Sequence, residues 1–433
     1  MASHARKLLD IVRPAVAFVL LWAGSVCAQI QNQQVELRVT EEHATNSDPA
    51  GQGKYGPTSA DSSAAGEQGP LRGITLRLST GLGYDDNVFR TSNNTRNDFF
   101  WLIRPEAIFN FAAGKHAFRL GYEGEYASHF EFSTEDFYDH RLFAGAGLDL
   151  SRKVDLNLGA QAHYGHDPRG SLGNRLVVLG DLDKWFEYRA TAELVVGRAI
   201  TRAQITPRVE FSGMRYLNNN QSIRDYDRQD FRLRGRWRFN PRFYGLAEGG
   251  FANINHRDPA NALDRTETDF LVGFGWQATA KTSGEVLFGV LNRDFDNAAT
   301  PDDTSPTWDI RVHWEPKPYS KLTAYTRRTS RENAGGVGNS LADSYGARWR
   351  HAFTRRLNMI SSIDYTTADF DSQRQDDYLT LDLGFRYQLT QWLDAGVTYQ
   401  YLNRRSNVPG INYDDQMFLV ELRAGTERAL GLW

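Results

Sequence analysis

Four arginines at alternate positions are the residues whose spacing says most about chemistry. They occur in one short segment, residues 231–239, where every intervening position is apolar or glycine (FRLRGRWRF). Successive side chains of a β-strand point to opposite faces, so a strand here is expected to be cationic on one face and apolar on the other. A row of guanidinium groups facing water favours anionic solutes or polymers. The four residues are Arg232, Arg234, Arg236 and Arg238.

Other charged residues occupy comparable alternating positions. An arginine facing lipid at the membrane midplane costs about 2–4 kcal/mol, so in a membrane barrel these charges are expected to face the lumen. Two interpretations stay open. Either the arginines line a translocation path that selects anions, or they pair with acids on neighbouring strands and only keep the lumen hydrated. The further arginines are Arg311, Arg348, Arg350 and Arg386, and the acidic lumen candidates are Glu123, Glu125, Asp309 and Asp382.

Catalytic and metal chemistry has little support, and we expect no catalytic residue, no cofactor and no metal site. His163 and His166 are three residues apart, which places them on opposite faces of a strand. Together with Asp167 and Ser171 they fall near one predicted rim, so an enzyme acting on outer-membrane lipid or surface polymer is kept as an alternative. Acidic pairs such as residues 85–86 have the chemistry to bind calcium, but such pairs are more often solvated loop edges.

The N-terminal residues predict export. Residues 1–28 combine a basic start, with Arg6, Lys7 and Arg13, a short apolar core and a small-residue end, as a secretory signal peptide does. The single cysteine, Cys27, lies within this segment, so the mature chain is expected to form no disulfide and no cysteine-based metal site. No later segment is apolar for long enough to form a transmembrane helix. These features leave the periplasm or an outer-membrane barrel as the destination.

Residues 73–433 show one hydropathy pattern throughout, and this pattern predicts an all-β fold. Segments of roughly ten to sixteen residues alternate apolar and polar side chains, as the strands of transmembrane barrels do. Short connections, such as residues 113–115 and 240–242, alternate with long polar ones, such as residues 167–183 and 331–342. The pattern predicts a transmembrane antiparallel β-barrel of about 18 strands, with about 16 as the alternative, short periplasmic turns and long extracellular loops. Both termini are then periplasmic, and a barrel of this width encloses an aqueous channel.

The remaining composition narrows the class of protein. Residues 29–72 are polar and without periodicity, which predicts a flexible periplasmic N-terminal arm. The formal net charge of -3 gives no reason to expect binding to nucleic acid. Aromatic residues make up 12% of a chain that is otherwise polar. That combination suits a barrel with an apolar outer surface and a wet lumen.

The start of the predicted barrel carries a recognisable motif. Residues 83–90 read GYDDNVFR, and this segment resembles the start of the outer-membrane β-barrel porin family (beta-barrel porin type 2) associated with exopolysaccharide and capsule biosynthesis gene clusters. The resemblance covers residues 74–433, mostly as strand pattern rather than motif. It implies a channel for a secreted polysaccharide that works with a periplasmic polysaccharide-export protein. It carries over no catalytic residue.

Taken together, the sequence predicts an outer-membrane porin of a Gram-negative bacterium, and no enzyme, that passes an exopolysaccharide outward. The expected partners are the secreted polysaccharide, outer-membrane lipid with lipopolysaccharide, and a periplasmic polysaccharide-export protein that the arm would contact. Two alternatives remain from other classes. One is a general or anion-preferring diffusion porin, which usually carries a constricting loop folded inward, and the other is the barrel enzyme.

Overall fold

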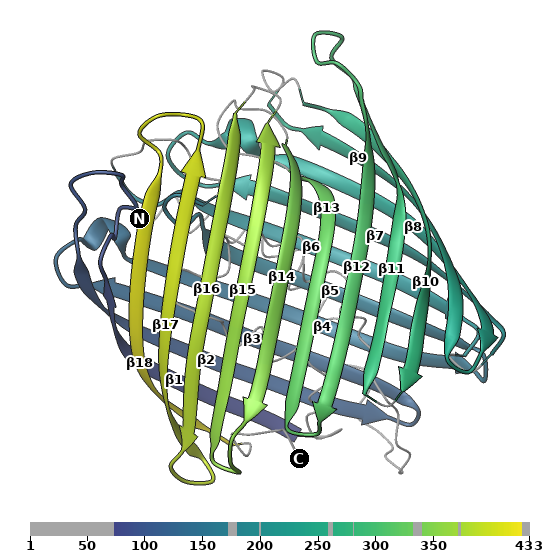
Figure 1. Cartoon of the computed structure of the whole chain (residues 1–433), viewed down its shortest axis with the longest axis horizontal. Coiled ribbons are helices and arrows are strands. Elements are labelled where there is room, and N and C mark those ends of the chain that lie inside the picture. The colour runs from purple at the N-terminus through teal and green to yellow at the C-terminus, as the bar shows by residue number, and fades with distance from the viewer. Residues whose placement is uncertain are drawn as a thin grey trace.

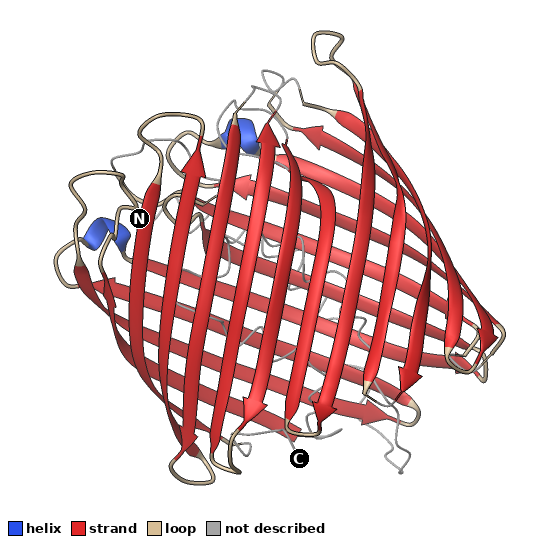
Figure 2. Cartoon of the chain, in the orientation of Figure 1, coloured by secondary structure: helices blue, strands red, loops and turns tan. Residues whose placement is uncertain are grey.

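The computed structural model describes residues 73–426, except residues 172–179, 199–200, 259–262, 280, 332–339 and 371–373. Eighteen strands of this part of the chain form one closed antiparallel sheet, in which neighbours in sequence are neighbours in space (Figure 1). Figure 2 shows that strands make up most of the described chain, with two short 3-10 helices in the loops. The prediction of an all-β barrel with about 18 strands is confirmed, and the alternative of about 16 is wrong.

The strands are 12 to 16 residues long, which suits tilted strands that cross a membrane. The helices are η4 (Ser133–Glu135) and η5 (Ser222–Arg224). The strands are β1 (Gly73–Asp85), β2 (Asp98–Ala113), β3 (His116–His129), β4 (Phe137–Ser151), β5 (Val154–His166), β6 (Lys184–Val196), β7 (Ala203–Tyr216), β8 (Tyr226–Asn240), β9 (Phe243–His256), β10 (Arg265–Thr279), β11 (Thr282–Phe295), β12 (Asp303–Lys317), β13 (Ser320–Arg331), β14 (Ser340–Ala352), β15 (Leu357–Phe370), β16 (Gln375–Gln388), β17 (Leu393–Ser406) and β18 (Tyr413–Gly425).

The first strand closes the barrel because it pairs on both sides. Leu82 of β1 lies opposite Trp101 of β2 in one register and opposite Val420 of β18 in the other. Each of the eighteen described strands therefore pairs on both sides, so the described sheet has no free edge strand. A transmembrane sheet needs this closure, since lipid offers the backbone no hydrogen bonds.

The outer face of the barrel is apolar along most of the strands. On β8, Phe231, Leu233 and Trp237 are between 45% and 50% exposed. Further exposed aromatic and aliphatic residues continue around the other strands, for example Phe270 on β10 and Val420 on β18. A continuous apolar surface of this extent is matched to hydrocarbon rather than to water. The alternating pattern of the sequence is thus an alternation between lipid and lumen.

The two rims differ in the length of their connections. Turns such as the one between Ala113 and His116 are short and lie at one rim, here called the short-turn rim. The opposite long-loop rim carries connections such as residues 86–97 and 167–183, and both 3-10 helices lie there (Figure 2). Strand β1 begins and strand β18 ends at the short-turn rim. No helix in the described residues is long and apolar enough to cross a membrane.

The lumen holds an apolar cluster at the long-loop rim. Its members lie on the inner faces of β2, β3, β4, β17 and β18, and Leu182 reaches it from the loop between β5 and β6. Leu182 is 4% exposed, so the end of this loop, next to β6, covers part of the inner wall. The cluster consists of Phe100, Leu102, Ala127, Phe137, Leu182, Leu402, Tyr413, Met417 and Leu419.

Candidate functional site in the barrel lumen

The predicted arginine ladder lies on the inner face of β8. Phe231 and Leu233 point outward, and the residues between and after them alternate to the inside. The inward residues are half-buried, because each lies against side chains of the adjoining strands. The structure therefore places the whole ladder on one lumen-facing row, running from mid-strand to the short-turn rim. The ladder is Arg232, Arg234, Arg236 and Arg238.

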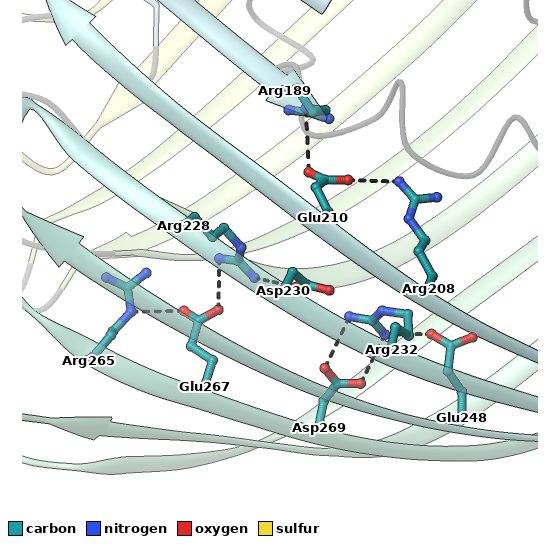
Figure 3. Close-up of polar contacts among 10 residues, drawn as sticks. All are labelled: Arg189, Arg208, Glu210, Arg228, Asp230, Arg232, Glu248, Arg265, Glu267 and Asp269. Carbon is teal, nitrogen blue, oxygen red and sulfur yellow. Dashed lines mark hydrogen bonds and ion pairs between the residues drawn. The ribbon is translucent and has the colours of Figure 1, made fainter. Parts of the chain in front are cut away.

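Arg232 is held between two acids on the following strands. It forms an ion pair with Glu248 on β9, and its two terminal nitrogens lie 3.1 and 3.2 Å from the carboxylate oxygens of Asp269 on β10 (Figure 3). A guanidinium that meets one carboxylate with two nitrogens forms a bidentate pair with a fixed orientation. The charge of Arg232 is therefore largely balanced within the wall.

The next ladder residues have different surroundings. Arg234 lies 2.5 Å from Oε2 of Glu285 on β11 and 3.6 Å from Oε2 of Glu248. The guanidinium of Arg236 lies 5.2 Å from the centre of the Tyr244 ring. Arg238 is opposite Tyr244 in the β8–β9 register. The ladder thus changes from ion pairs in mid-strand to an aromatic neighbour at the short-turn rim.

The ion pairs continue around the wall on both sides of the ladder. Acids and arginines alternate across β6, β7, β8 and β10, so a single carboxylate often serves two guanidinium groups (Figure 3). Such cross-strand pairs support the interpretation in which charges hydrate and order the lumen. The pairs are Arg189–Glu210, Arg208–Glu210, Arg228–Asp230, Arg228–Glu267 and Arg265–Glu267.

A second group of predicted arginines lies on a different part of the wall. Arg348 and Arg350 face inward on β14, and Arg311 on β12 is in register with Glu285. The described inner faces of β13 and β14 carry five cations and no acid. We call these five residues the cationic wall. They are Lys321, Arg327, Arg331, Arg348 and Arg350.

Arg386 belongs to neither group. It contacts Glu421 on β18 and lies 3.5 Å from Asp394 on β17. Asp394 is also paired with Arg423 at 3.0 Å. The eight predicted arginines therefore share the lumen face, but the structure distributes them over three separate surroundings.

The four acidic candidates also face the lumen, each with its own neighbour. Three are in direct contact with a partner: Glu123 with Arg141 at 3.2 Å, Glu125 with Arg104 at 3.1 Å and Asp382 with Ser362 at 2.8 Å. The fourth, Asp309, lies opposite Arg327 in the β12–β13 register. The acids thus lie on three separate strands, β3, β12 and β16, rather than at one site.

Sequence reasoning missed the aromatic residues of the lumen and Arg327. Tyr244 and Tyr325 each lie across an inward glycine of the next strand, Gly275 and Gly346 respectively. The signal was present only in part, because strand parity marks Tyr325 and Arg327 as inward. Which glycine lies beside which ring depends on strand register, and a single sequence does not give register.

The GYDDNVFR segment joins the two ends of the barrel. Arg90 donates from Nε to Asp415 of β18 at 2.8 Å, and the Asn87 amide donates to the carbonyl oxygens of Thr91 and Asp414. Asp85, Asp86 and Asp415 offer carboxylate oxygens within 4.8 Å of one another. The Arg90 guanidinium already supplies positive charge to this group, so the segment is explained as a structural link.

The inward loop between β5 and β6 is anchored to the same place. The carbonyl of Arg169 accepts a hydrogen bond from Arg90 at 2.7 Å, and the carbonyl of Gly170 accepts one from Tyr413 at 3.1 Å. The Arg169 side chain pairs with Glu135, which is 1% exposed. The described part of this loop is therefore fixed to the loop after β1, to the start of β18 and to η4.

The base of the loop carries Asp167, which lies outside the membrane-spanning strands. Its carboxylate is 2.9 Å from Arg224 and accepts a hydrogen bond from the Trp185 indole at 2.9 Å. Burial raises the pKa of Asp167 above its usual value although Arg224 is close.

The two histidines of the enzyme alternative do not lie on opposite faces, as the spacing had suggested. The His166 ring turns inward at the end of β5, lies 4.1 Å from the Phe137 ring and pairs with Asp139 at 2.9 Å. His163 packs against Trp185 at 4.8 Å between ring centres. The backbone amide of Ser171 bonds to Pro168 within the loop. These contacts explain both histidines as packed lumen residues rather than as a catalytic base.

Comparison with known families decides the class. Residues 74–426 match the family described as "Putative beta-barrel porin 2". The matched region includes all eighteen strands. The chain belongs to this porin family. No curated protein matches the chain.

Solved porin structures resemble this porin only distantly. The outer membrane protein OpdK from Pseudomonas aeruginosa has 11% identity and a TM-score of 0.44, covering 82% of this chain and 99% of its own. OccK3 (OpdO) from the same organism has 13% identity and a TM-score of 0.44, with 82% and 96% covered. A BenF-like porin from Pseudomonas fluorescens Pf-5 has 10% identity and a TM-score of 0.44, with 82% and 100% covered.

Membership of a porin family explains why the outer surface of the barrel is apolar. The protein is an outer-membrane porin, and the rows of exposed leucine, phenylalanine and tryptophan are the surface that faces lipid. The charged inner rows are then the walls of the channel.

Proposed function

We propose that this porin exports a secreted exopolysaccharide across the outer membrane. The observation that supports the proposal most is the paired wall of β6–β10, in which arginines and acids alternate along the lumen (Figure 3). Such a wall offers many hydrogen-bonding groups to sugar hydroxyls, but the pairing keeps each single contact weak. A polymer has to enter the channel and also slide on, so many weak sites serve it better than one strong site.

The proposal also fixes the orientation of the barrel. Strand β1 begins and strand β18 ends at the short-turn rim, which we assign to the periplasm together with both termini. The predicted arm, residues 29–72, precedes β1 and would meet a periplasmic polysaccharide-export protein on that side. The arm, the signal peptide at residues 1–28 and residues 427–433 lie outside the described residues.

The long-loop rim is assigned to the cell surface and its lipopolysaccharide. On the outer face near this rim, the Tyr122 hydroxyl is 3.0 Å from Nδ1 of His140 and 3.2 Å from the Tyr126 hydroxyl. The Lys184 ammonium lies 5.2 Å from the Tyr138 ring centre. Rings with polar tips favour the boundary between lipid and water, so this face suits the headgroup level of the outer leaflet.

A second candidate is an anion-preferring diffusion porin. At the end of the connection between β5 and β6, Leu182 packs into the lumen cluster, as a residue of a constricting loop would. The cationic wall of β13 and β14 would favour anions. An enzyme is not proposed, because the inward histidines are explained by packing and ion pairing.

The two candidates differ in the size of solute that passes. Proteoliposomes of the purified mature chain are loaded with a ladder of oligosaccharides, and release is measured for each length. Export predicts that oligomers well beyond a disaccharide leave the vesicles, and that deletion of the gene traps polymer in the periplasm. Release restricted to mono- and disaccharides, with unchanged surface polymer after deletion, contradicts export and supports the diffusion porin. Vesicles without protein are the control for leakage.

A further inference from the structure

Two tyrosines on the lumen wall are held in the same unusual arrangement. Tyr325 of β13 lies opposite Gly346 of β14, and Gly346 lies opposite Asp364 of β15. The Tyr325 hydroxyl donates to the Asp364 carboxylate, two strands away, at 2.5 Å. A Cβ atom on Gly346 would come within 2.3 Å of the tyrosine ring. The ring therefore extends across the glycine, along the wall.

Tyr244 repeats this arrangement on β9, four strands before β13 in the barrel wall. It lies opposite Gly275 of β10, and Gly275 lies opposite Glu285 of β11. Its hydroxyl donates to Glu285 at 2.9 Å, and a Cβ atom on Gly275 would come within 2.3 Å of its ring. The order tyrosine, glycine, acid across three neighbouring strands is the same as for Tyr325.

The arrangement has a direct consequence for the lumen. A tyrosine whose hydroxyl reaches an acid two strands away has its ring along the wall, over the glycine of the intervening strand. The side of the ring away from the glycine then borders the channel, and at Tyr244 the Arg236 guanidinium lies over the ring. Glycine makes this possible, because any other side chain at Gly275 or Gly346 would occupy the place of the ring. A flat aromatic face is a surface on which the apolar face of a pyranose ring packs.

Arginines flank both rings. Arg311 lies opposite Tyr325, and Arg327 is the next inward residue on its strand. The Arg236 guanidinium lies 5.2 Å from the Tyr244 ring centre. The neighbouring acids Asp364 and Glu285 accept the tyrosine hydroxyls, and Asp309 faces Arg327. A guanidinium beside a stacking surface is placed to hold a carboxylate on the stacked sugar.

We propose that Tyr244 and Tyr325 are two stacking subsites for a carboxylated polysaccharide, each assisted by its flanking arginines. Tyr244 is the second residue of β9 and Tyr325 the sixth of β13, both counted from the short-turn rim. A polymer entering from that rim meets Tyr244 first and Tyr325 deeper in the lumen, beside the cationic wall. The inference rests on the proposed export function and adds the substrate class, a polymer that contains sugar acids.

The same arrangement occurs once more among the described strands, but on the outer face. Tyr188 of β6 lies opposite Gly213 of β7, and its hydroxyl contacts Asp227 of β8. Tyr188 and Tyr325 share the same backbone setting and the same type of hydrogen bond, but only Tyr325 faces the lumen. Tyr188 is therefore a matched control for the loss of ring and hydroxyl.

The test is a planar bilayer recording with the full mature chain. Uronic acid oligomers and neutral glucose oligomers of equal length are added, and the dwell time of each current blockade is measured. Tyr244→Leu and Tyr325→Leu are expected to shorten the dwell of both oligomers about two- to tenfold, the range of one aromatic contact. Tyr325→Phe keeps the ring and is expected to keep most of the dwell time. Arg327→Gln is expected to shorten only the uronate blockades, and Tyr188→Leu neither.

Each outcome supports or contradicts a separate claim. If the unaltered channel is blocked by oligomers of both kinds, but folded Tyr244→Leu and Tyr325→Leu channels show unchanged dwell times, the subsites are wrong and export stands. Equal dwell of uronate and neutral oligomers, unaffected by Arg327→Gln, overturns the acidic substrate class alone. If neither oligomer blocks or passes the unaltered channel, the proposed export function itself fails. Heat-modifiable migration on gels shows which variants have folded.

Discussion

The Nε atom of Arg90 lies 2.8 Å from Oδ2 of Asp415, and the two side chains are 2% and 0% exposed. Arg90 follows the first strand and Asp415 belongs to the last, so this ion pair joins the two ends of the barrel at the long-loop rim. The same guanidinium donates to the carbonyl of Arg169 at 2.7 Å. One side chain thus connects the closing seam to the inward loop between β5 and β6.

Replacement of Arg90 by glutamine should destabilise the barrel strongly. The substitution leaves Asp415 buried without its cation, and loss of one partner of a buried pair costs about 3–5 kcal/mol. The expected result is a lower urea midpoint for unfolding in detergent micelles, together with a more mobile β5–β6 loop. The double variant Arg90→Gln/Asp415→Asn should recover part of the loss, because no charge is then left buried.

Arg405→Gln is the matched control for that experiment. Arg405 pairs with Asp414, one residue before Asp415, but the two side chains are 52% and 49% exposed. Exposed pairs contribute only about 0–1 kcal/mol, so the urea midpoint should hardly change. Equal effects of Arg90→Gln and Arg405→Gln would show that burial of the Arg90 pair does not matter for closure.

A charge on the outer face should be tolerated far less than one on the inner face. Leu233 is 45% exposed between Arg232 and Arg234, and we assign its side chain to lipid. Leu233→Arg is expected to cost about 2–4 kcal/mol if the position is near the bilayer midplane. The measurement is reversible folding into phospholipid vesicles. Gln229→Arg, at an exposed outward position near the long-loop rim of β8, is the comparison and should cost less. A larger cost at Gln229 would contradict the assigned position of the membrane.

The fold could be predicted from the sequence because alternation and loop length are local signals. The FRLRGRWRF segment defines its own two faces, and the short connection at residues 240–242 separates β8 from β9 as expected. Closure between β1 and β18 is not local, since it joins residues more than 300 positions apart. The GYDDNVFR segment marked the family, but its role as a clasp follows from Arg90, Asn87 and Asp415 only in three dimensions.

The candidate site was predicted less completely, and the reason is register. The sequence indicates that Arg232 and Arg234 share a face, but not that Glu248, Asp269 and Glu285 lie beside them. Those partners decide whether an arginine is a free cation or half of an ion pair. Sequence reasoning ranked the ladder first, but acids on neighbouring strands largely balance the charges of Arg232 and Arg234. It missed Arg327, which belongs to the cationic wall on β13 and β14.

Glutamine at Glu248 should make the channel more selective for anions. Glu248 pairs with Arg232 and lies 3.6 Å from Arg234, so its neutralisation leaves more positive charge on the ladder. The reversal potential in a potassium chloride gradient should shift toward chloride, and Arg232→Gln should shift it in the opposite direction. Arg328→Gln is the control, because its ion pair with Asp343 lies on the outer face. If Glu248→Gln and Arg232→Gln shifted the reversal potential in the same direction, the description of Arg232 and Glu248 as an ion pair in the channel wall would be wrong.

The buried Asp167 should make the stability of the folded protein depend on pH in an unusual direction. Its side chain is 13% exposed, and burial raises its pKa above the usual value. A raised pKa means that the folded protein binds this proton more tightly than the unfolded chain does. The ionised form is therefore penalised on folding, and the contribution of Asp167 to stability falls as the pH rises from the ordinary carboxyl range through the raised pKa.

The substitution Asp167→Asn removes the titrating carboxyl group. Comparison with the unaltered chain therefore isolates the contribution of Asp167 to the pH dependence of stability. The free energy of unfolding of the unaltered chain, relative to Asp167→Asn, should increase as the pH is lowered from 7 toward 4. Other carboxylates titrate in both proteins and cancel in the difference. Asp181→Asn, an exposed position of the same loop, controls for the loss of a charge alone. A relative stability that falls on acidification would mean that the pair with Arg224, rather than burial, governs Asp167, and the pKa would then lie below its usual value.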